Sequence, residues 1–233
     1  MFKHFLITRF NLGLRGNCGN NGVSAKQWMR ERKKLFWRFT VPSVAAQTER
    51  NFTWLILLDE GLPQIAIPEP AVAVYGRGEA DGLEKAMRIV RGAQSDFVIT
   101  SRLDNDDAIH RDYVARVQAS VEARHLTAIN FDGQLIYDMS NRRMHERPRG
   151  FCTNTLSLVE QTNKNPRGIY QHGHGRAYLW CEVKTVGGRG LSLVLVHGGN
   201  IKNRVKGKML MGAPGSFRDG YPWFDLNNVE NWK

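Results

Sequence analysis

The sequence predicts one α/β domain built on an open, mostly parallel sheet flanked by helices, with a smaller β-containing region after it. Short apolar runs rich in Val, Ile and Leu alternate with segments of helical spacing, a pattern typical of strands buried on both faces. Acidic residues close two of these runs, and ligands of open α/β sheets bind at the carboxyl ends of the strands. The 233 residues suffice for one such domain with its own core.

The first half of the chain carries this pattern most clearly. Strands are expected at 4–10, 52–58, 71–75 and 97–102, and helices at 25–39, 42–47, 82–91 and 111–123. Ser24 is placed to cap the first helix, and Pro42 suits the first turn of the second. This order of elements describes an open nucleotide-binding sheet, so residues 1–125 are expected to form the nucleotide-binding half.

The pattern weakens after residue 125. Further strands are expected at 126–131, 134–137, 156–159 and 191–196. Asp132-Gly133 lies between the first two of them and is a strong two-residue hairpin signal. We expect residues 126–205 to complete the same domain and residues 206–233 to form a loosely ordered C-terminal tail.

The net charge of +11 indicates an anionic partner. Nucleic acid, an anionic membrane surface and a phosphorylated ligand all satisfy it, but the basic residues are dispersed and no nucleic-acid-binding motif accompanies them. Nucleic acid is therefore disfavoured. The three cysteines are widely spaced and form no Cys-x-x-Cys pair, which argues for reduced thiols and against structural zinc.

No apolar stretch has the length of a membrane-spanning helix, and the first residues lead into strand-like sequence instead of a signal peptide. We expect a cytoplasmic protein, with peripheral contact to an anionic inner membrane as one use of the basic surface.

The most informative stretch is 97–109, where a strand-like run ends in Asp104, Asp106 and Asp107. Three carboxylates within four residues repel one another at neutral pH, and a divalent cation would offset that repulsion. The spacing rules out an EF-hand calcium loop, because alanine and isoleucine occupy the fifth and sixth positions from Asp104. Two interpretations stay open: an Mg²⁺ or Mn²⁺ site completed by phosphate oxygens, and a plain acidic turn.

Two other polar residues follow predicted strands. Asp59 ends the run at 52–58, where it either caps the loop or accepts hydrogen bonds from a base or ribose. His197 ends the run at 191–196 and precedes a glycine pair that lets a ligand approach closely. An imidazole added to Asp104 and Asp106 would complete protein ligation of Mn²⁺, although a surface histidine with a hydrogen bond is the simpler interpretation.

Several short motifs together make the chain similar to a bacterial rhamnosyltransferase family, whose members are glycosyltransferases of the GT-A type. The motifs are Thr8-Arg9-Phe10-Asn11, Leu35-Phe36 with Phe39, Pro42-Ser43-Val44 with Gln47, Phe52-Thr53-Trp54-Leu55 with Asp59, the stretch 100–109, and Val196-His197-Gly198 with Asn200. The resemblance covers most of residues 4–205, and the central motif is its most specific part.

The resemblance implies a metal-dependent transfer of a sugar, rhamnose by the family's name, from a nucleoside-diphosphate donor to a glycan or lipid-linked acceptor. Asp104-Asn105-Asp106 would be the Asp-x-Asp motif, in which Asp104 reaches the ribose or the metal and Asp106 binds the metal between the two phosphates. Asp59 would lie beside the nucleobase.

The resemblance also places Arg9 and Arg102 near the nucleotide and His197 at a late metal-binding position. An inverting transferase needs a base for the acceptor hydroxyl, and Asp132, Glu160 and Glu182 are the downstream carboxylates that could serve. We name Asp132 and Glu160 as the catalytic candidates. A metal-dependent phosphodiesterase or nuclease, and a nucleic-acid-binding module without catalysis, are the alternative functions.

Overall fold

The structure, a computed structural model, describes residues 1–13, 24–147, 152–197, 205–212, 215 and 217–224. Its main layer is a seven-stranded sheet with the order β10-β6-β9-β4-β1-β2-β3. The strands are β1 (Phe2–Arg9), β2 (Thr53–Asp59), β3 (Val72–Gly76), β4 (Phe97–Arg102), β6 (Thr127–Phe131), β9 (Ser157–Gln161) and β10 (Glu182–Val186). All except β9 run parallel, so the carboxyl ends of six strands meet at one edge. The open, mostly parallel sheet predicted from the sequence is confirmed.

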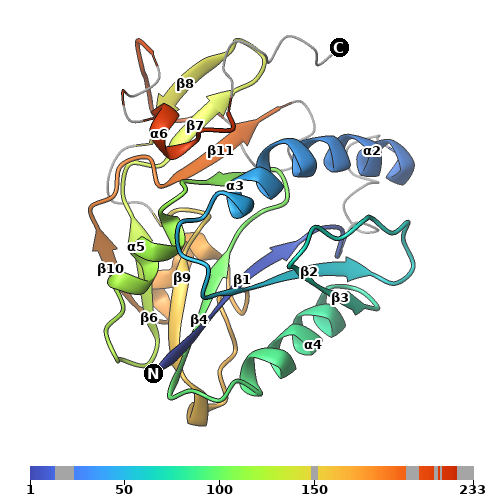
Figure 1. Cartoon of the computed structure of the whole chain (residues 1–233), viewed down its shortest axis with the longest axis vertical. Helices are drawn as coiled ribbons and strands as arrows, with labels where there is room; N and C mark the ends of the chain where they lie inside the picture. Colours follow the sequence, from blue (N-terminus) through green and yellow to red (C-terminus); the bar gives the residue numbers. More distant parts are fainter. Residues whose placement is uncertain (14–23, 148–151, 198–204, 213–214, 216, 225–233) are drawn as a thin grey trace.

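Helices cover both faces of this sheet (Figure 1). On one face, α4 (Glu79–Arg91) buries Ala86, Met87 and Val90 against β1, β2 and β3. On the other face, α5 (Tyr113–Ala119) and the helical segment before β2 enclose a second core cluster. The central strands are apolar on both sides because each side packs on a helix.

The helical segment before β2 is continuous, whereas the sequence predicted two helices. It consists of α2 (Ala25–Leu35), a π-helical turn η2 (Phe36–Thr40) and α3 (Val41–Ala45). Ser24 caps α2 as predicted, accepting a hydrogen bond from the Gln27 amide at 3.1 Å. Pro42 is tolerated because it stands at the start of α3, directly after the π-turn. The π-turn lets Phe36 and Phe39 face two different core clusters.

A second, five-stranded sheet has the order β12-β8-β7-β11-β5. Its strands are β5 (Ala108–Ile109), β7 (Leu135–Asp138), β8 (Arg143–Glu146), β11 (Ser192–Val196) and β12 (Lys208–Met209). In Figure 1 it lies at the end of the molecule opposite the N-terminus. Because β4 leads through the acidic stretch into β5, this stretch joins the two sheets.

The hairpin predicted at Asp132-Gly133 is wrong. The turn exists, and Gly133 adopts the left-handed conformation with φ 69°. However, β6 stays in the first sheet and β7 enters the second, where it pairs with β8 and β11. The Gly133 carbonyl accepts a hydrogen bond from the Gly190 amide at 2.9 Å, which fixes the turn between the two sheets.

Two further expectations differ from the structure. The tail is not loosely ordered at 217–224, because α6 (Phe217–Gly220) and the residues after it bury Phe217, Tyr221 and Phe224 in the core of the second sheet. Strand β10 was not expected, since its half-exposed Glu-Val-Lys-Thr-Val sequence lacks a buried run. The proposed boundaries at 125 and 205 stay predictions; β6, β9 and β10 from the later region share the first sheet with β1–β4.

The remaining short helices are η3 (Thr162–Lys164) and η4 (His174–Leu179). Among the described residues, no helix is long and apolar enough to cross a membrane.

A buried histidine makes the stability of the fold depend on pH. His4 in β1 is buried, and its Nε2 lies 2.7 Å from Ser101 Oγ in β4. Burial lowers the pKa of His4 from 6.5 to about 3. The unfolded chain therefore binds this proton near pH 6.5 and the folded chain does not, so the free energy of unfolding falls as the pH is lowered from about 6.5, by about 1.4 kcal/mol per unit.

We expect His4→Gln to flatten the pH dependence of the free energy of unfolding between pH 6.5 and 4, measured by urea denaturation. His172→Gln changes an exposed histidine and should keep the wild-type slope. Equal slopes for wild type and His4→Gln would show that His4 is not the titrating group.

Candidate active site

The acidic stretch lies between the carboxyl end of β4 and β5, at the edge where the parallel strands end. Asn105, Asp106 and Asp107 are buried, and Asp104 is half-buried. Burial of carboxylates costs free energy unless hydrogen-bond donors or positive charges surround them. Each of the three aspartates has such partners, and the partners differ.

Asp106 lies between an arginine and a histidine. The guanidinium of Arg32, from the inward face of α2, forms an ion pair with its Oδ2, and His197 Nε2 donates to the same oxygen at 3.0 Å. Burial would raise the pKa of Asp106, but the charge of Arg32 and the contact with His197 outweigh it and lower this pKa to about 2. Asp106 is therefore ionised at any physiological pH.

Asp104 is held by Arg102, the last residue of β4. The guanidinium donates to both carboxylate oxygens at 3.0 Å. It also donates to His174 Nδ1 at 3.0 Å, and burial followed by the charge of Arg102 lowers the pKa of His174 to about 4. A neutral imidazole can accept this hydrogen bond, so Arg102 links Asp104 to η4.

Asp107 points away from the edge and into the junction of the two sheets. Its Oδ1 accepts from the Leu195 amide in β11 at 3.1 Å, and its Oδ2 accepts from the Asn154 side chain. Its carbonyl accepts from Thr40 Oγ1 at 2.8 Å. Burial, together with the charges of Asp106 and Asp104, raises the pKa of Asp107 well above its usual value. These contacts give Asp107 a structural role, holding β5, β11 and the π-turn together.

Arg9, at the end of β1, lies against the same tyrosine ring as Arg102. It forms an ion pair with Glu79 of α4, and its guanidinium lies 4.5 Å from the centre of the Tyr170 ring. The guanidinium of Arg102 lies 5.1 Å from the same ring. Tyr170 thus brings Arg9 and Arg102 to one place at the carboxyl ends of β1 and β4.

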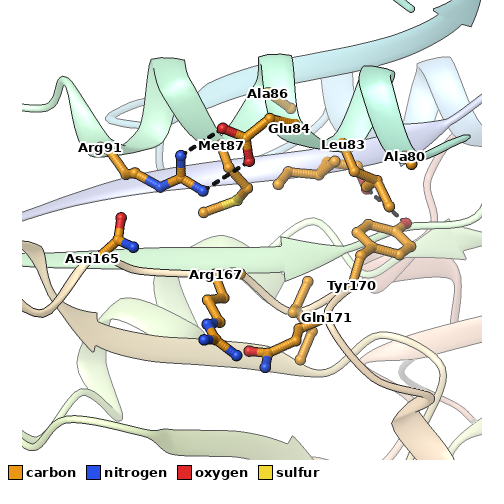
Figure 2. A pocket seen from close by; sticks show the side chains of 13 residues that line it. Ala80, Leu83, Glu84, Ala86, Met87, Arg91, Asn165, Arg167, Tyr170 and Gln171 are labelled. Atoms are coloured by element: carbon orange, nitrogen blue, oxygen red, sulfur yellow. Dashed lines mark hydrogen bonds and ion pairs between the residues drawn. The ribbon is translucent and has the colours of Figure 1, made fainter. Parts of the chain in front are cut away.

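A groove of about 380 Å³ runs from this place along the face of the sheet, between α4 and the segment 165–171. Figure 2 shows Leu83 and Met87 of α4 on one side and Arg167 and Gln171 on the other, with Tyr170 at one end. On the α4 side of the groove, the Arg91 guanidinium pairs with Glu84 of the same helix. The groove therefore opens beside the site without sharing the aspartates.

Asp59 ends β2, two strands from β4 in the sheet. Its amide donates to Asn11 Oδ1 at 2.7 Å, and its own Oδ1 accepts from the Gly61 amide at 2.9 Å. The carboxylate thus caps the loop after β2, which is the first of the two roles that the sequence suggested for Asp59. It lies at the same edge as the acidic stretch, so a role beside a ligand stays a prediction.

The structure separates the two predicted catalytic carboxylates. Asp132 follows β6, which runs parallel to β4 two strands away, and the registers place it at the same edge as Asp104, roughly 10 Å across the sheet. It accepts a hydrogen bond from the Gly188 amide at 3.3 Å. Glu160 instead pairs in register with Val98, six residues and about 20 Å along the strand from Asp104. Its buried oxygens accept from the Arg167 and Gly168 amides, so the geometry does not support Glu160 as a catalytic group.

Sequence reasoning missed Arg32 as a site residue. A signal exists: Arg32 falls four residues after Trp28 and four before Phe36, on the apolar face of the helix. An arginine on that face reaches a partner inside the protein when it is buried. Tyr170 and Asn154 were also missed, and their positions in long connecting segments give no comparable signal.

Two of the three predicted metal ligands, Asp106 and His197, meet in the structure. Asp104 faces Arg102, and in the part of the chain that the structure describes no three His, Cys, Asp or Glu side chains converge closely enough to hold a metal ion. A carboxylate and an imidazole nevertheless suit Mn²⁺ better than Mg²⁺, because Mg²⁺ takes oxygen ligands, and Mn²⁺ can complete its shell with phosphate oxygens and water. The donor chemistry thus fits a divalent cation that arrives with a diphosphate.

A family model described as "Putative rhamnosyl transferase" matches residues 20–209. No curated protein sequence matches the chain.

The fold is also similar to that of a solved structure that contains a nucleotide sugar. The structure of S. aureus TarS 1–349 in complex with UDP-GlcNAc is 10% identical, with a TM-score of 0.50, over 87% of this chain and 62% of that chain. GalNAc-T7 with UDP, GalNAc and Mn²⁺ is 10% identical, with a TM-score of 0.44, over 87% of this chain and 45% of that chain. The chain spans about 60% of the TarS 1–349 structures that it matches. At these identities the likeness shows the fold alone, and it confirms the predicted GT-A-like class.

The different partners of the aspartates predict different effects on stability. Asp107→Ala removes the buried carboxylate that accepts from the Leu195 amide and the Asn154 side chain, so we expect the free energy of unfolding to fall by about 2–4 kcal/mol. Asp104→Ala removes a half-buried ion pair whose arginine, Arg102, keeps its contact with His174, so it should cost less than Asp107→Ala. Urea denaturation of both variants measures the difference. Equal losses would contradict the structural role of Asp107.

Proposed function

Because the chain belongs to the rhamnosyl transferase family whose model it matches, we propose that it is a glycosyltransferase. It moves a sugar, rhamnose by the family's name, from a nucleoside-diphosphate donor to a glycan or lipid-linked acceptor. The observation that carries the proposal is the meeting of Asp104 and Asp106 with the guanidinium groups of Arg102 and Arg32 at the carboxyl end of β4. Carboxylates and guanidinium groups together suit a diphosphate and its cation.

The donor binds in the crevice at the carboxyl ends of β1, β2 and β4, where open α/β sheets take nucleotides. Asp59 at the end of β2 lies toward the nucleobase. Arg9 and Arg102 lie at the ends of β1 and β4, and their planar guanidinium groups match phosphate oxygens in pairs. In this proposed arrangement, from β2 to β4, the diphosphate and the reacting sugar lie over Asp104 and Asp106.

Departure of the nucleoside diphosphate puts negative charge on the leaving oxygen. Arg102 and Arg32 stabilise that charge, because fixed positive groups in a partly buried site need little reorganisation. Asp106 and His197, with Asp104 beside them, would hold a divalent cation that supplies further neutralisation of the diphosphate when it is bound.

Asp132 is the base that we propose for the acceptor hydroxyl. Among the predicted carboxylates it lies at the right edge, and the roughly 10 Å of sheet between it and the acidic stretch leaves room for a sugar. A positioned base of this kind contributes about 10²–10⁴ in rate. An acceptor that is lipid-linked would bring the protein to an anionic membrane, and the net charge of +11 supports such contact.

The proposal is tested by thermal unfolding with UDP, GDP or dTDP, each with and without Mn²⁺. We expect one nucleoside diphosphate to raise the unfolding temperature in the presence of Mn²⁺, because a ligand that binds only the folded state stabilises it. Asp106→Ala should abolish the metal-linked part of the shift. Asp96→Ala, which removes an exposed carboxylate at the opposite edge, is the matched control and should keep it.

A mixed oligonucleotide at moderate salt separates the alternatives. Tight, salt-sensitive oligonucleotide binding with no response to any nucleoside diphosphate would overturn the transferase in favour of a nuclease or a nucleic-acid-binding module. A full nucleotide response in Asp106→Ala would remove the acidic stretch from the donor site.

A further inference from the structure

Arg32 is a buried residue of the site that the sequence analysis did not identify. It is 5% exposed, and its guanidinium lies 5.1 Å from the Trp28 ring on the preceding turn of α2. Besides its ion pair with Asp106, it donates to Asn105 Oδ1 at 3.3 Å. Asn105 in turn donates to the Phe10 carbonyl after β1. Packing and hydrogen bonds on several sides therefore hold Arg32 against the acidic stretch.

Asp106 needs such a partner when no ligand is present. A buried carboxylate that loses its counter-ion is strongly destabilising, and Asp106 is 5% exposed. Arginine supplies a permanent positive charge, since its guanidinium stays protonated in proteins. The same oxygen, Oδ2, also receives His197 Nε2, so the guanidinium occupies the carboxylate atom at which the two predicted metal ligands meet.

We propose that Arg32 is the resident counter-ion of Asp106, and that it competes with a divalent cation for this carboxylate. The inference rests on the proposed function, because the cation is the one that accompanies the donor. Arg32 and a cation on Asp106 repel each other at short range, so the protein binds the metal weakly by itself. A donor diphosphate offers Arg32 another anion, and metal and nucleotide therefore bind cooperatively.

The test titrates the full chain with Mn²⁺ alone and measures free Mn²⁺ by electron paramagnetic resonance. We expect Arg32→Met to tighten the Kd for Mn²⁺ at least tenfold, because it removes the competing charge. Arg32→Lys keeps a charge and should stay near the wild type. Arg30→Met removes an exposed charge two residues earlier on the same helix and is the matched control, expected to match the wild type.

A second readout uses stability and does not depend on metal. Arg32→Met should lower Tm by about 6–20 °C, because it leaves the buried carboxylate of Asp106 without its guanidinium partner. Adding Asp106→Asn removes that charge, and the double variant should regain most of the loss. If Arg32→Met does not fold, the double variant is still expected to fold.

Two results overturn the inference: an unchanged Kd for Mn²⁺ in Arg32→Met, or a double variant no more stable than Arg32→Met. Both results are measured on variants, whereas the proposed function is tested by the response of the wild-type protein to nucleoside diphosphates. A wild-type protein that responds to a nucleoside diphosphate with Mn²⁺, combined with either result, retains the transferase and removes only the role of Arg32. If the wild type shows no such response, the proposed transferase function is wrong. The Mn²⁺ titration and the comparison of Arg32→Met with the double variant still test the ion pair between Arg32 and Asp106.

Discussion

Three carboxylates at the end of one strand, two of them buried and one half-buried, are the constraint on which the rest of the structure depends. Asp104, Asp106 and Asp107 cannot be enclosed unless donors reach them from several directions. Helix α2 brings Arg32, β4 ends in Arg102, and β11 brings the Leu195 amide and His197. Elements that are far apart in the sequence thus converge on four consecutive residues, and these residues join the two sheets.

The same constraint separates structural from functional acids. Asp107 is turned toward the sheet junction and is satisfied by an amide and a side chain that a ligand would not displace. Asp104 and Asp106 face charged partners at the edge where parallel strands end, and charged partners can be exchanged for a cation or for phosphate oxygens. An acidic turn alone would need neither a buried arginine nor a histidine from a second sheet, so the arrangement favours a ligand site over the plain turn.

The sequence predicts the local features well and the long-range ones poorly. The buried parallel strands, the Ser24 cap and the acidic strand end follow from patterns a few residues long. The separation of β6 from β7 depends on the Gly190–Gly133 hydrogen bond across 57 residues, and a turn signal alone cannot report it. Phe217 and Tyr221 are buried only because they pack on the second sheet. The Pro and Gly content of the tail gives no sign of this packing. Arg32 was missed because most arginines on a helix are exposed to solvent. Glu160 was proposed because it is a carboxylate, but the residue type alone does not show where along a strand the side chain lies.

The most direct measurement of the central claim is a crystal structure of the protein grown with Mn²⁺ and the nucleoside diphosphate that stabilises it. We predict the cation on Asp106 and His197, the diphosphate over the end of β4, and the Arg32 guanidinium moved from Asp106 to the phosphate oxygens. A structure in which nucleotide and cation bind elsewhere, with Asp104 and Asp106 still paired to Arg102 and Arg32, would contradict it.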